Sequence, residues 1–279
     1  MYKSGINLDD ENCALEAGSV VSVIKALNVL EAFTPAQSSL TLTQLSRELS
    51  MPKSTLLNII KTLESKGYLH RDKNSKSYSL GYKVLELGYN MRSSISIIQY
   101  AIPFMENIQN KTGMTVYLTT HINGKVLYLD GVYSSRSYGK YSVIGKTLPM
   151  HCTGSGKVML CYFSQEKVNA IIKRWGLEQV TPNTIVNEEQ LMKELEQIRK
   201  QGYAVDNEEE TLGSRCVAVA IRDSGGEPVG AISISGSVHS LSEESIDMHV
   251  KLVANACTAL AEYSHLFPAS QLQGNKNLI

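Results

Sequence analysis

The sequence lacks the features that would assign it to several specialised classes of protein. It has one tryptophan, four phenylalanines and five cysteines (13, 152, 161, 216 and 257), and no two cysteines form a CxxC pair. An odd number of scattered cysteines is typical of a reducing cytoplasm and argues against a disulfide framework or a zinc knuckle. No apolar run reaches the roughly 18 residues of a membrane span, and the first residues lack the apolar core of a signal peptide. We therefore expect a cytoplasmic protein without a membrane segment.

The chain also lacks net charge, because 27 basic residues balance 27 acidic ones. The charge is nevertheless unevenly distributed. Residues 19–83 hold nine Lys or Arg and four Asp or Glu, a net charge of +5, so the remainder carries −5. A basic N-terminal segment on an otherwise acidic chain indicates local contact with a polyanion. The length of 279 residues favours two domains with separate cores.

Residues 50–66 have the pattern of an amphipathic helix. Its apolar stripe consists of Leu56, Ile59, Ile60 and Leu63. Ser50 is the expected N-cap and Pro52 is expected near the first turn. The outer face carries short polar and basic side chains, among them Lys53, Ser54, Thr55, Asn58 and Lys61. Such a face is found on solvated surface helices and on helices that lie in a DNA major groove.

The neighbouring segments favour the DNA-binding interpretation. Residues 19–33 and 41–49 each have helical periodicity, and the second is joined to the helix at residues 50–66 by a tight connection, as in a helix-turn-helix. Thr41 is a possible cap of the second helix. The apolar residues of the first helix fall on one face: Val20, Val23, Ile24, Leu27, Leu30 and Phe33.

A predicted hairpin follows the helix-turn-helix. Gly67 has the character of a helix-ending residue, and the strands at residues 68–71 and 77–80 flank the turn formers of residues 72–75. The tip carries the basic residues Arg71, Lys73 and Lys76. A basic hairpin in this place is typical of the wing of a winged helix, which contacts phosphates or the minor groove. We predict a winged helix-turn-helix at residues 19–80, after a disordered tail at residues 1–18.

The rest of the chain is predicted to form a linker helix and an α+β domain. The linker, residues 81–95, has an apolar stripe of Val84, Leu87 and Met91 that we expect to pack against a second copy or the next domain. The domain covers residues 96–265, and residues 266–279 form a polar tail. Its expected helices are at 96–111, 154–162, 165–174, 187–200 (capped by Asn187 and closed by Gly202) and 242–266. Its expected strands lie on both sides of Asn123-Gly124 and at 137–142, 203–206, 215–222 and 228–235.

The segment LPMHCTGSGKVML, residues 148–160, is the most suggestive motif for ligand binding. It lacks the glycine and the Ser or Thr that a Walker A motif would need at His151 and Val158. A small-residue turn before a helix either presents free amides to an anion or is simply a tight turn. Asp206 ends a strand and could point inward, whereas the three glutamates after it suggest a solvated loop. The spacing of His151, Cys152 and Cys216 resembles no metal motif, and no catalytic triad can be assembled. We expect neither a metal nor a cofactor.

Over residues 19–265 the chain resembles the IclR family of bacterial transcriptional regulators. The similar stretches are MPKSTLLNIIKTLESKGYL, LPMHCTGSGKVML, GYAVDNEEETLGSRCVAVAIRD and VGAISISG, in that order. The resemblance implies an N-terminal winged helix-turn-helix, a dimerising linker helix and a C-terminal GAF-like α+β effector domain. It also implies homodimers or dimers of dimers (homotetramers) on a palindromic operator in double-stranded DNA.

The effector half is most similar to the glyoxylate-bypass repressor that names the family. By this resemblance, a ligand carboxylate would meet the backbone amides of Gly154 and Ser155. The acid, thiol and two hydroxyls of the pocket would be Asp206, Cys216, Ser233 and Ser235. The sequence departs from the family at Cys152 and Thr153, where alanine or serine is common. It also departs at Leu57-Asn58, where many members have His-Arg, so the operator sequence does not carry over.

Three functions follow from these patterns. The first is a ligand-responsive DNA-binding regulator, a repressor rather than an activator, whose effector is a small organic acid with an oxo or hydroxy group. The second is a GAF-type redox enzyme that uses Cys152 and Cys216. The third makes the C-terminal half a dimerisation scaffold without a ligand.

Overall fold

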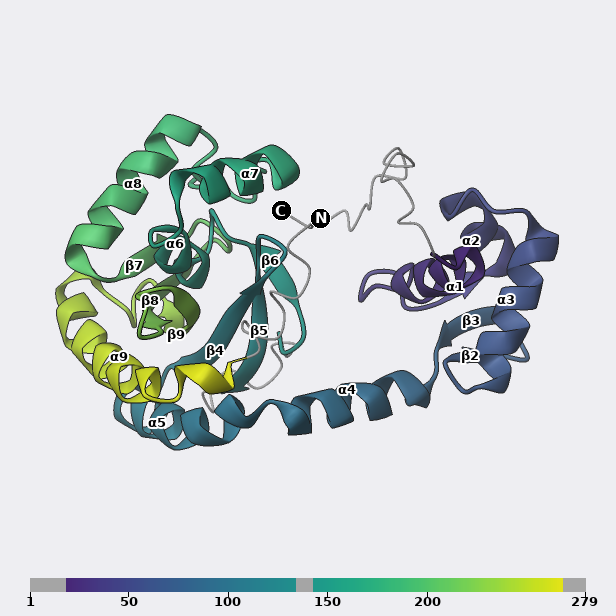
Figure 1. Cartoon of the computed structure of the whole chain (residues 1–279), viewed down its shortest axis with the longest axis horizontal. Helices are drawn as coiled ribbons and strands as arrows, with labels where there is room; N and C mark the ends of the chain where they lie inside the picture. The colour runs from purple at the N-terminus through teal and green to yellow at the C-terminus, as the bar shows by residue number, and fades with distance from the viewer. Residues whose placement is uncertain (1–18, 134–142, 268–279) are drawn as a thin grey trace. The chain divides into compact units, whose positions relative to one another are not determined.

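The computed structural model describes residues 19–133 and 143–267 (Figure 1). The chain divides into two compact units, with the division between Ser93 and Ser94. The tail expected at residues 1–18, the strand expected at residues 137–142 and most of the polar C-terminal tail lie outside the described residues.

The N-terminal unit is a winged helix. Its elements are α1 (Val21–Glu31), β1 (Leu40–Thr41), α2 (Leu42–Glu48), α3 (Lys53–Ser65), β2 (Leu69–Arg71), β3 (Ser77–Leu80) and most of α4 (Tyr82–Ser94). The strands form a small antiparallel sheet in the order β1-β3-β2. Leu45, Leu56, Ile60 and Leu69 are among the residues of its core. The predicted helix pair and hairpin are therefore confirmed, and β1 is an additional strand that the sequence did not indicate.

Residues that begin and end helices in this unit are largely those that the sequence predicted. Thr41 caps α2 through a complete capping box: its hydroxyl accepts from the Gln44 amide (3.3 Å), and the Gln44 side chain accepts from the Thr41 amide (2.8 Å). Gly67 follows α3 with a φ of +77°, a conformation that favours glycine.

Two predictions for the N-terminal unit are wrong. Ser50 does not cap α3, because it has a φ of +47° and belongs to the turn that ends α2, where the Met51 amide donates to the Ser46 carbonyl (3.0 Å). Helix α3 begins at Lys53, and its cap position, Pro52, contributes no side-chain hydrogen bond.

Only part of the apolar face predicted for α1 is buried in the core. Val20, Val23 and Leu27 are at least half exposed, whereas Val29 and Phe33 are buried. The core reaches only the C-terminal part of α1, so helical periodicity located an apolar face without showing which part of it is covered.

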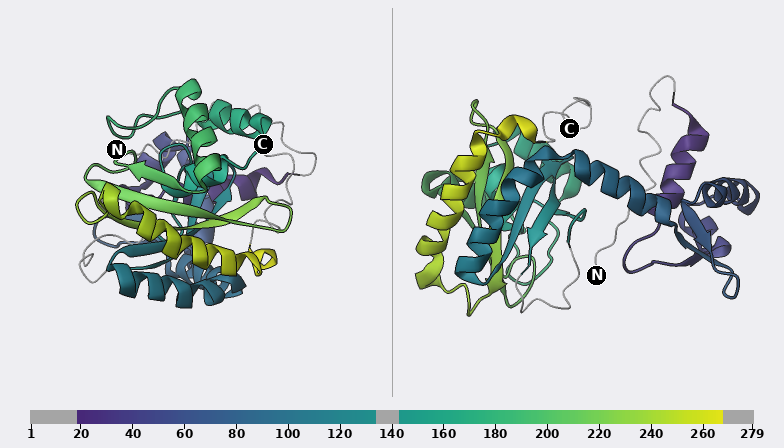
Figure 2. Two further views of the ribbon diagram at one scale, coloured as in Figure 1. Left: turned by 90° about the vertical axis from the view of Figure 1, so that its left-hand side faces the viewer. Right: turned by 90° about the horizontal axis from the view of Figure 1, so that it is seen from below.

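The C-terminal unit is a three-layered α+β domain (Figure 2). Its six-stranded antiparallel sheet has the order β6-β5-β4-β9-β8-β7. The strands are β4 (Thr115–Ile122), β5 (Lys125–Val132), β6 (Thr147–Pro149), β7 (Ala204–Asn207), β8 (Ser214–Arg222) and β9 (Pro228–Ser237). Helices α5 (Ser96–Thr112) and α9 (Ile246–Ala261) cover one face, and α6 (Gly154–Leu160), α7 (Gln165–Trp175) and α8 (Glu188–Gln201) lie over the other.

Most element signals in this unit are confirmed. Asn123 and Gly124 form the β4–β5 turn, with φ of +49° and +74°. The Asn187 side chain accepts from the Gln190 amide (3.0 Å) at the start of α8, and Gly202 ends that helix with a φ of +84°. Ser242 does not open the last helix as predicted, because a short 3-10 turn (Glu243–Ser245) separates it from α9.

Candidate functional site

The outer surface of α3 carries the side chains expected at a DNA interface. Lys53, Ser54, Thr55, Asn58 and Lys61 are all exposed. Among the described residues, the side chains of Ser54 and Asn58 make no hydrogen bond, so their donors and acceptors are available to a partner. The exposed hydroxyls of Thr62 and Ser65 differ, because they donate to carbonyl oxygens of Asn58 and Thr62 within α3 (3.0 and 2.8 Å).

The wing is a well-defined turn with basic side chains. Asp72 Oδ1 accepts from the amides of Asn74 (2.9 Å) and Ser75 (2.7 Å), and these bonds lower the pKa of the Asp72 carboxyl. The turn carries Lys73 and Lys76, both exposed. Arg71, also exposed, lies with its guanidinium 5.7 Å from the centre of the Tyr78 ring. All three basic residues predicted at the tip therefore lie on the surface of one hairpin.

A second candidate site lies in the C-terminal unit, where the sheet presents small side chains to α6. Ala204, Ala218 and Ala231 are fully buried beneath the helix layer. Their small size lets α6 lie close to the sheet. A Cβ atom at Gly156 would come within 2.2 Å of the Met150 carbonyl oxygen, so only glycine fits at that position. A Cβ atom at Gly154 would lie 3.2 Å from Cys216 Sγ, which places the N-terminal end of α6 directly on β8.

The structure brings the predicted pocket residues together. Asp206 on β7 pairs with Cys216 on β8, which pairs with Ser235 on β9, so the three form one row across the sheet. Ser233 lies two residues before Ser235 and therefore faces the same side. Gly154 packs on Cys216 from above.

Ser155 and Ser233 have unusual hydroxyls. Both residues are about 1% exposed, and neither Oγ atom has a hydrogen-bond partner of good geometry in the described part of the chain. The Ser233 hydroxyl lies near enough to the Cys216 thiol to favour its ionised form slightly. Buried polar atoms without a partner are rare and commonly mark a site for water or a ligand.

Three residues near this site, Tyr117, Tyr128 and Glu210, were not assigned to it from the sequence, and Cys152 was considered only for a metal or redox site and as a departure from the family. Tyr117 pairs with Ser233 across β4 and β9, and its ring meets that of Tyr128 edge-on at 5.2 Å between ring centres. Cys152 and Glu210 interact electrostatically with the same group of side chains. Alternation along β4 shows that Tyr117 faces one side of a sheet. It cannot show that β9, more than a hundred residues later, is the neighbouring strand.

Burial strongly alters the acidity of Asp206. It raises the pKa of the carboxyl from 3.8 to about 7, whereas hydrogen bonds to Oδ1 from the amides of Glu209 (2.8 Å) and Glu210 (3.4 Å) lower that pKa. The nearby charge of Glu209 acts in the same direction as burial, and Lys157 opposes it. Near neutral pH both forms of Asp206 are populated, so its carboxyl can donate a hydrogen bond as well as accept one.

The two pocket thiols are poorly suited to redox catalysis. Burial, with a contribution from Asp206, raises the pKa of both Cys152 and Cys216 well above the usual value for a thiol. Reactive cysteines have a lowered pKa, because the thiolate is the nucleophile. Within the described ranges, no group of three or more His, Cys, Asp or Glu side chains is arranged to hold a metal ion.

We predict that Asp206→Asn stabilises the protein more at pH 8 than at pH 5. The folded-state pKa of Asp206 is raised, so its contribution to stability is fully present below the unfolded-state pKa of about 3.8 and is lost progressively as the pH rises to about 7. Removal of the charge should increase the free energy of unfolding at pH 8 by about 1–3 kcal/mol. Thermal denaturation at the two pH values measures this difference. The exposed Asp247→Asn is the control, and equal effects of Asp206→Asn at both pH values would contradict the prediction.

Known proteins provide independent evidence of what these sites are. Residues 22–73 match the IclR helix-turn-helix domain, and residues 90–262 match the C-terminal domain of the bacterial transcriptional regulator IclR. The regulator XynR of Escherichia coli K12 is 35% identical over 221 residues, which cover 77% of this chain and 86% of that protein. The transcriptional repressor IclR of the same strain is 30% identical over 241 residues, covering 86% and 88%.

Solved structures agree with these matches. The Thermotoga maritima IclR structure is 31% identical, with a TM-score of 0.68 over 87% of this chain and 98% of that one. An IclR homolog from Microbacterium hydrocarbonoxydans complexed with 4-hydroxybenzoate has the same fold, with a TM-score of 0.74 at 21% identity over 88% and 99% of the two chains. None of the helices in the described ranges has the length and apolar character of a membrane span. The chain therefore belongs to the IclR family of DNA-binding transcriptional regulators with a ligand-binding C-terminal domain, and it is a regulator rather than an enzyme.

Proposed function

We propose that this protein is a cytoplasmic repressor that binds a palindromic operator as a dimer and is controlled by a small organic acid. The observation that carries the DNA-binding part is the outer face of α3, where Ser54 and Asn58 are exposed and have no hydrogen-bond partner among the described residues. The repressor named IclR, 30% identical over most of both chains, supports repression rather than activation.

The N-terminal end of α3 supports the same docking geometry. Pro52 provides no side-chain cap, so the first-turn amides have no side-chain acceptor from the cap residue. Uncapped amides at a helix start are well placed to donate to a DNA phosphate. Ser54 and Asn58, one turn apart, then face the base edges, whereas Lys53, Lys61 and the wing residues Arg71, Lys73 and Lys76 contact phosphates.

We predict that Asn58→Ala weakens specific operator binding by about 1–3 kcal/mol and changes binding to random DNA little, because base contacts carry the sequence information. Lys73→Ala should weaken both and reduce the salt dependence, because fewer counterions are released. Fluorescence anisotropy at several salt concentrations measures these effects. Ser65→Ala is a matched control, since its hydroxyl is exposed on α3 but donates to the Thr62 carbonyl. An equal loss on both kinds of DNA for Asn58→Ala would refute its base-reading role.

Helix α4 carries the dimerisation part of the proposal. None of its residues is buried within the single chain, and Tyr82, Leu85 and Tyr89 are 90%, 71% and 67% exposed. In the predicted stripe, Leu87 and Met91 are also 45% and 53% exposed. An open groove of about 930 Å³ next to α4 is lined in part by Leu69, Tyr82, Leu85 and Tyr89. Two exposed apolar stripes on one helix favour burial against a partner.

We predict a dimer at micromolar concentration and its dissociation by the double substitution Leu85→Glu/Leu87→Glu, which would place charges in the buried interface. A two-fold dimer presents two α3 helices to half-sites about one DNA turn apart. Sedimentation equilibrium measures the state of association. Glu86→Ala on the same helix is the control, because Glu86 pairs only with the exposed Lys83 (2.8 Å). A wild-type monomer with full operator affinity would exclude dimeric recognition through α4.

The start of α6 supports a carboxylate as the effector's recognised group. Thr153 satisfies the amides of Gly156 and Lys157 through its hydroxyl and carbonyl (3.2 and 2.9 Å). The amides of Gly154 and Ser155 have no such partner in the described part of the chain, and the Ser155 hydroxyl is a buried atom without a partner. Donors that converge at the positive end of a helix suit an anion, by roughly 0.3–1 kcal/mol and more when partly buried.

The acidic residues near the predicted effector site disfavour a second carboxylate. Asp206 and Glu210 lie near Tyr128 and Cys216, and burial, with smaller contributions from neighbouring groups, raises the pKa of Tyr117 and Tyr128. Hydroxyl and oxo groups suit these surroundings, because tyrosine and protonated Asp206 can donate while serine and ionised Asp206 can accept. We infer an effector with one carboxylate and a neutral oxygen-rich end.

We predict that pyruvate, glyoxylate or a sugar-derived 2-oxo acid binds the wild type, and that Asp206→Ala and Ser235→Ala each weaken binding about tenfold or more while operator binding is retained. Titration calorimetry measures the affinity. Ser237→Ala is the control, since Ser237 is the next residue on the same face of β9 but is exposed. Full ligand response in both pocket variants would refute the assignment. Absence of binding by every acid would favour the dimerisation scaffold.

A further inference from the structure

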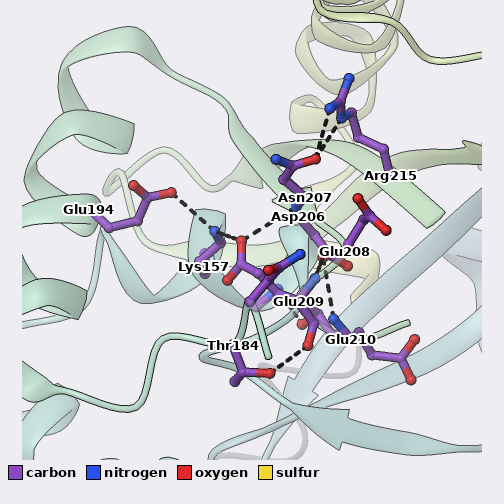
Figure 3. Close-up of polar contacts among 12 residues, drawn as sticks. Lys157, Thr184, Glu194, Asp206, Asn207, Glu208, Glu209, Glu210 and Arg215 are labelled. Atoms are coloured by element: carbon purple, nitrogen blue, oxygen red, sulfur yellow. Dashed lines mark hydrogen bonds and ion pairs between the residues drawn. The ribbon is translucent and has the colours of Figure 1, made fainter. Parts of the chain in front are cut away.

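The one lysine of α6 is buried in the interior of the C-terminal unit. Lys157 is about 1% exposed, and its Nζ donates to Glu209 Oε1 (2.5 Å) and to Glu194 Oε1 (3.0 Å) (Figure 3). Glu209 is 6% exposed, and its second oxygen, Oε2, has no partner within the described residues. The group thus joins α6, α8 and the turn between β7 and β8 through a single ammonium.

A buried ion pair is a poor means of stabilising a fold. Removal of two charges from water costs several kcal/mol per ion, and apolar replacements of similar size are often as stable or more stable. Most ion pairs in proteins are exposed to solvent, as is the pair of Lys193 with Glu189 (2.7 Å) in this domain. A lysine in the interior therefore indicates that the surrounding groups must be held in a defined geometry. The groups that the lysine binds show which geometry this is.

Lys157 connects the start of α6 with the turn that holds Asp206. On α6 it lies about one turn beyond Gly154 and Ser155, the proposed carboxylate donors. The Glu209 that it holds donates its own amide to Asp206 Oδ1 (2.8 Å). The Glu209 carbonyl accepts from Thr184 Oγ1 (2.7 Å), so the turn is held on a second side (Figure 3).

We propose that Lys157 is a positioning residue for the effector: its bond to Glu209 sets the distance and orientation of Asp206 relative to the amides of Gly154 and Ser155. The proposal rests on the function proposed above. Lys157 touches no ligand in this arrangement. It acts through Glu209, as outer partners of metal ligands act through the ligands they orient.

The test compares three variants by effector titration, thermal denaturation and carboxyl NMR titration of Asp206. Lys157→Met removes the ammonium and keeps an unbranched side chain one heavy atom shorter. Glu209→Gln keeps an oxygen acceptor for Lys157. The double variant Lys157→Met/Glu209→Gln removes the charges of Lys157 and Glu209 and leaves only the partly exposed Glu194 without its cation, so it protects the test against simple unfolding. Lys193→Met, which breaks an exposed pair, is the matched control.

We expect Lys157→Met to lose about 10–100-fold in effector affinity, the range typical of a lost outer partner. Glu209→Gln should retain affinity within about threefold, because the bond from Lys157 remains. The double variant should melt near the wild-type temperature and still bind as weakly as Lys157→Met. Wild-type affinity in either variant that lacks Lys157 would overturn the proposal. A melting temperature and affinity that recover together in the double variant would also overturn it, because Lys157 would then act only on folding.

The titration of Asp206 separates failure of this proposal from failure of the proposed function. The charged and titratable groups around Asp206 are Lys157 on α6, Glu209 and Glu210 in the turn, Cys152, Cys216 and Tyr128. If the wild type binds none of the acids, the effector proposal fails. The titration midpoint of Asp206 still shows whether Lys157 positions that carboxyl. In the double variant the loss of the Glu209 charge opposes the loss of the Lys157 charge, so charge alone predicts no rise in the Asp206 midpoint. A higher midpoint in the double variant, unmatched in Lys193→Met, therefore supports the positioning role, because it shows that the hydrogen bond from the Glu209 amide has weakened. An unchanged or lower midpoint in the double variant overturns it.

Discussion

The close contact of α6 with the sheet is the constraint on which the C-terminal unit depends. Alanines beneath the helix and glycine at position 154, where a Cβ atom would lie 3.2 Å from Cys216 Sγ and 3.4 Å from the Ala218 Cβ atom, allow the two layers to approach. The approach has two consequences. It places the first amides of α6 on Cys216, at the centre of the pocket face, and it takes Lys157 out of water. A buried ammonium must find carboxylates, and the turn that provides Glu209 is the one that holds Asp206.

The sequence predicts an interaction well when the two partners lie close together along the chain. The Thr41 and Asn187 caps, the Asn123-Gly124 turn and the helix-ending Gly67 and Gly202 were predictable, because their partners lie within a few residues. The start of α3 was not, because Ser50 is used by the turn that closes α2. Likewise β1, with two residues, has almost no sequence signal, and it exists because β3 offers it a free edge.

The pocket shows the same division between local and distant information. Asp206, Cys216, Ser233 and Ser235 entered through a family resemblance, and the register of β7, β8 and β9 now explains why they meet. Tyr117 and Lys157 could not be found in this way. Their roles depend on strand order and on the distance between α6 and the sheet, which no local pattern records. An uninterrupted helical segment gives no sign that one of its lysines lies in the interior.

The charges of the pocket also suggest why an anion would bind there in one orientation. Lys157 between Glu194 and Glu209 leaves one net negative charge on the side of the turn, next to an Asp206 whose pKa of about 7 allows it to be neutral. The start of α6 presents amides that have no partner among the described residues. A carboxylate is therefore attracted to these amides and repelled by the turn. Its approach raises the pKa of Asp206 further, because like charges disfavour ionisation, so an anionic effector should bind together with a proton. The Asp206 carboxyl then becomes a hydrogen-bond donor as the ligand arrives, which suits an oxo group or hydroxyl at the far end of the effector.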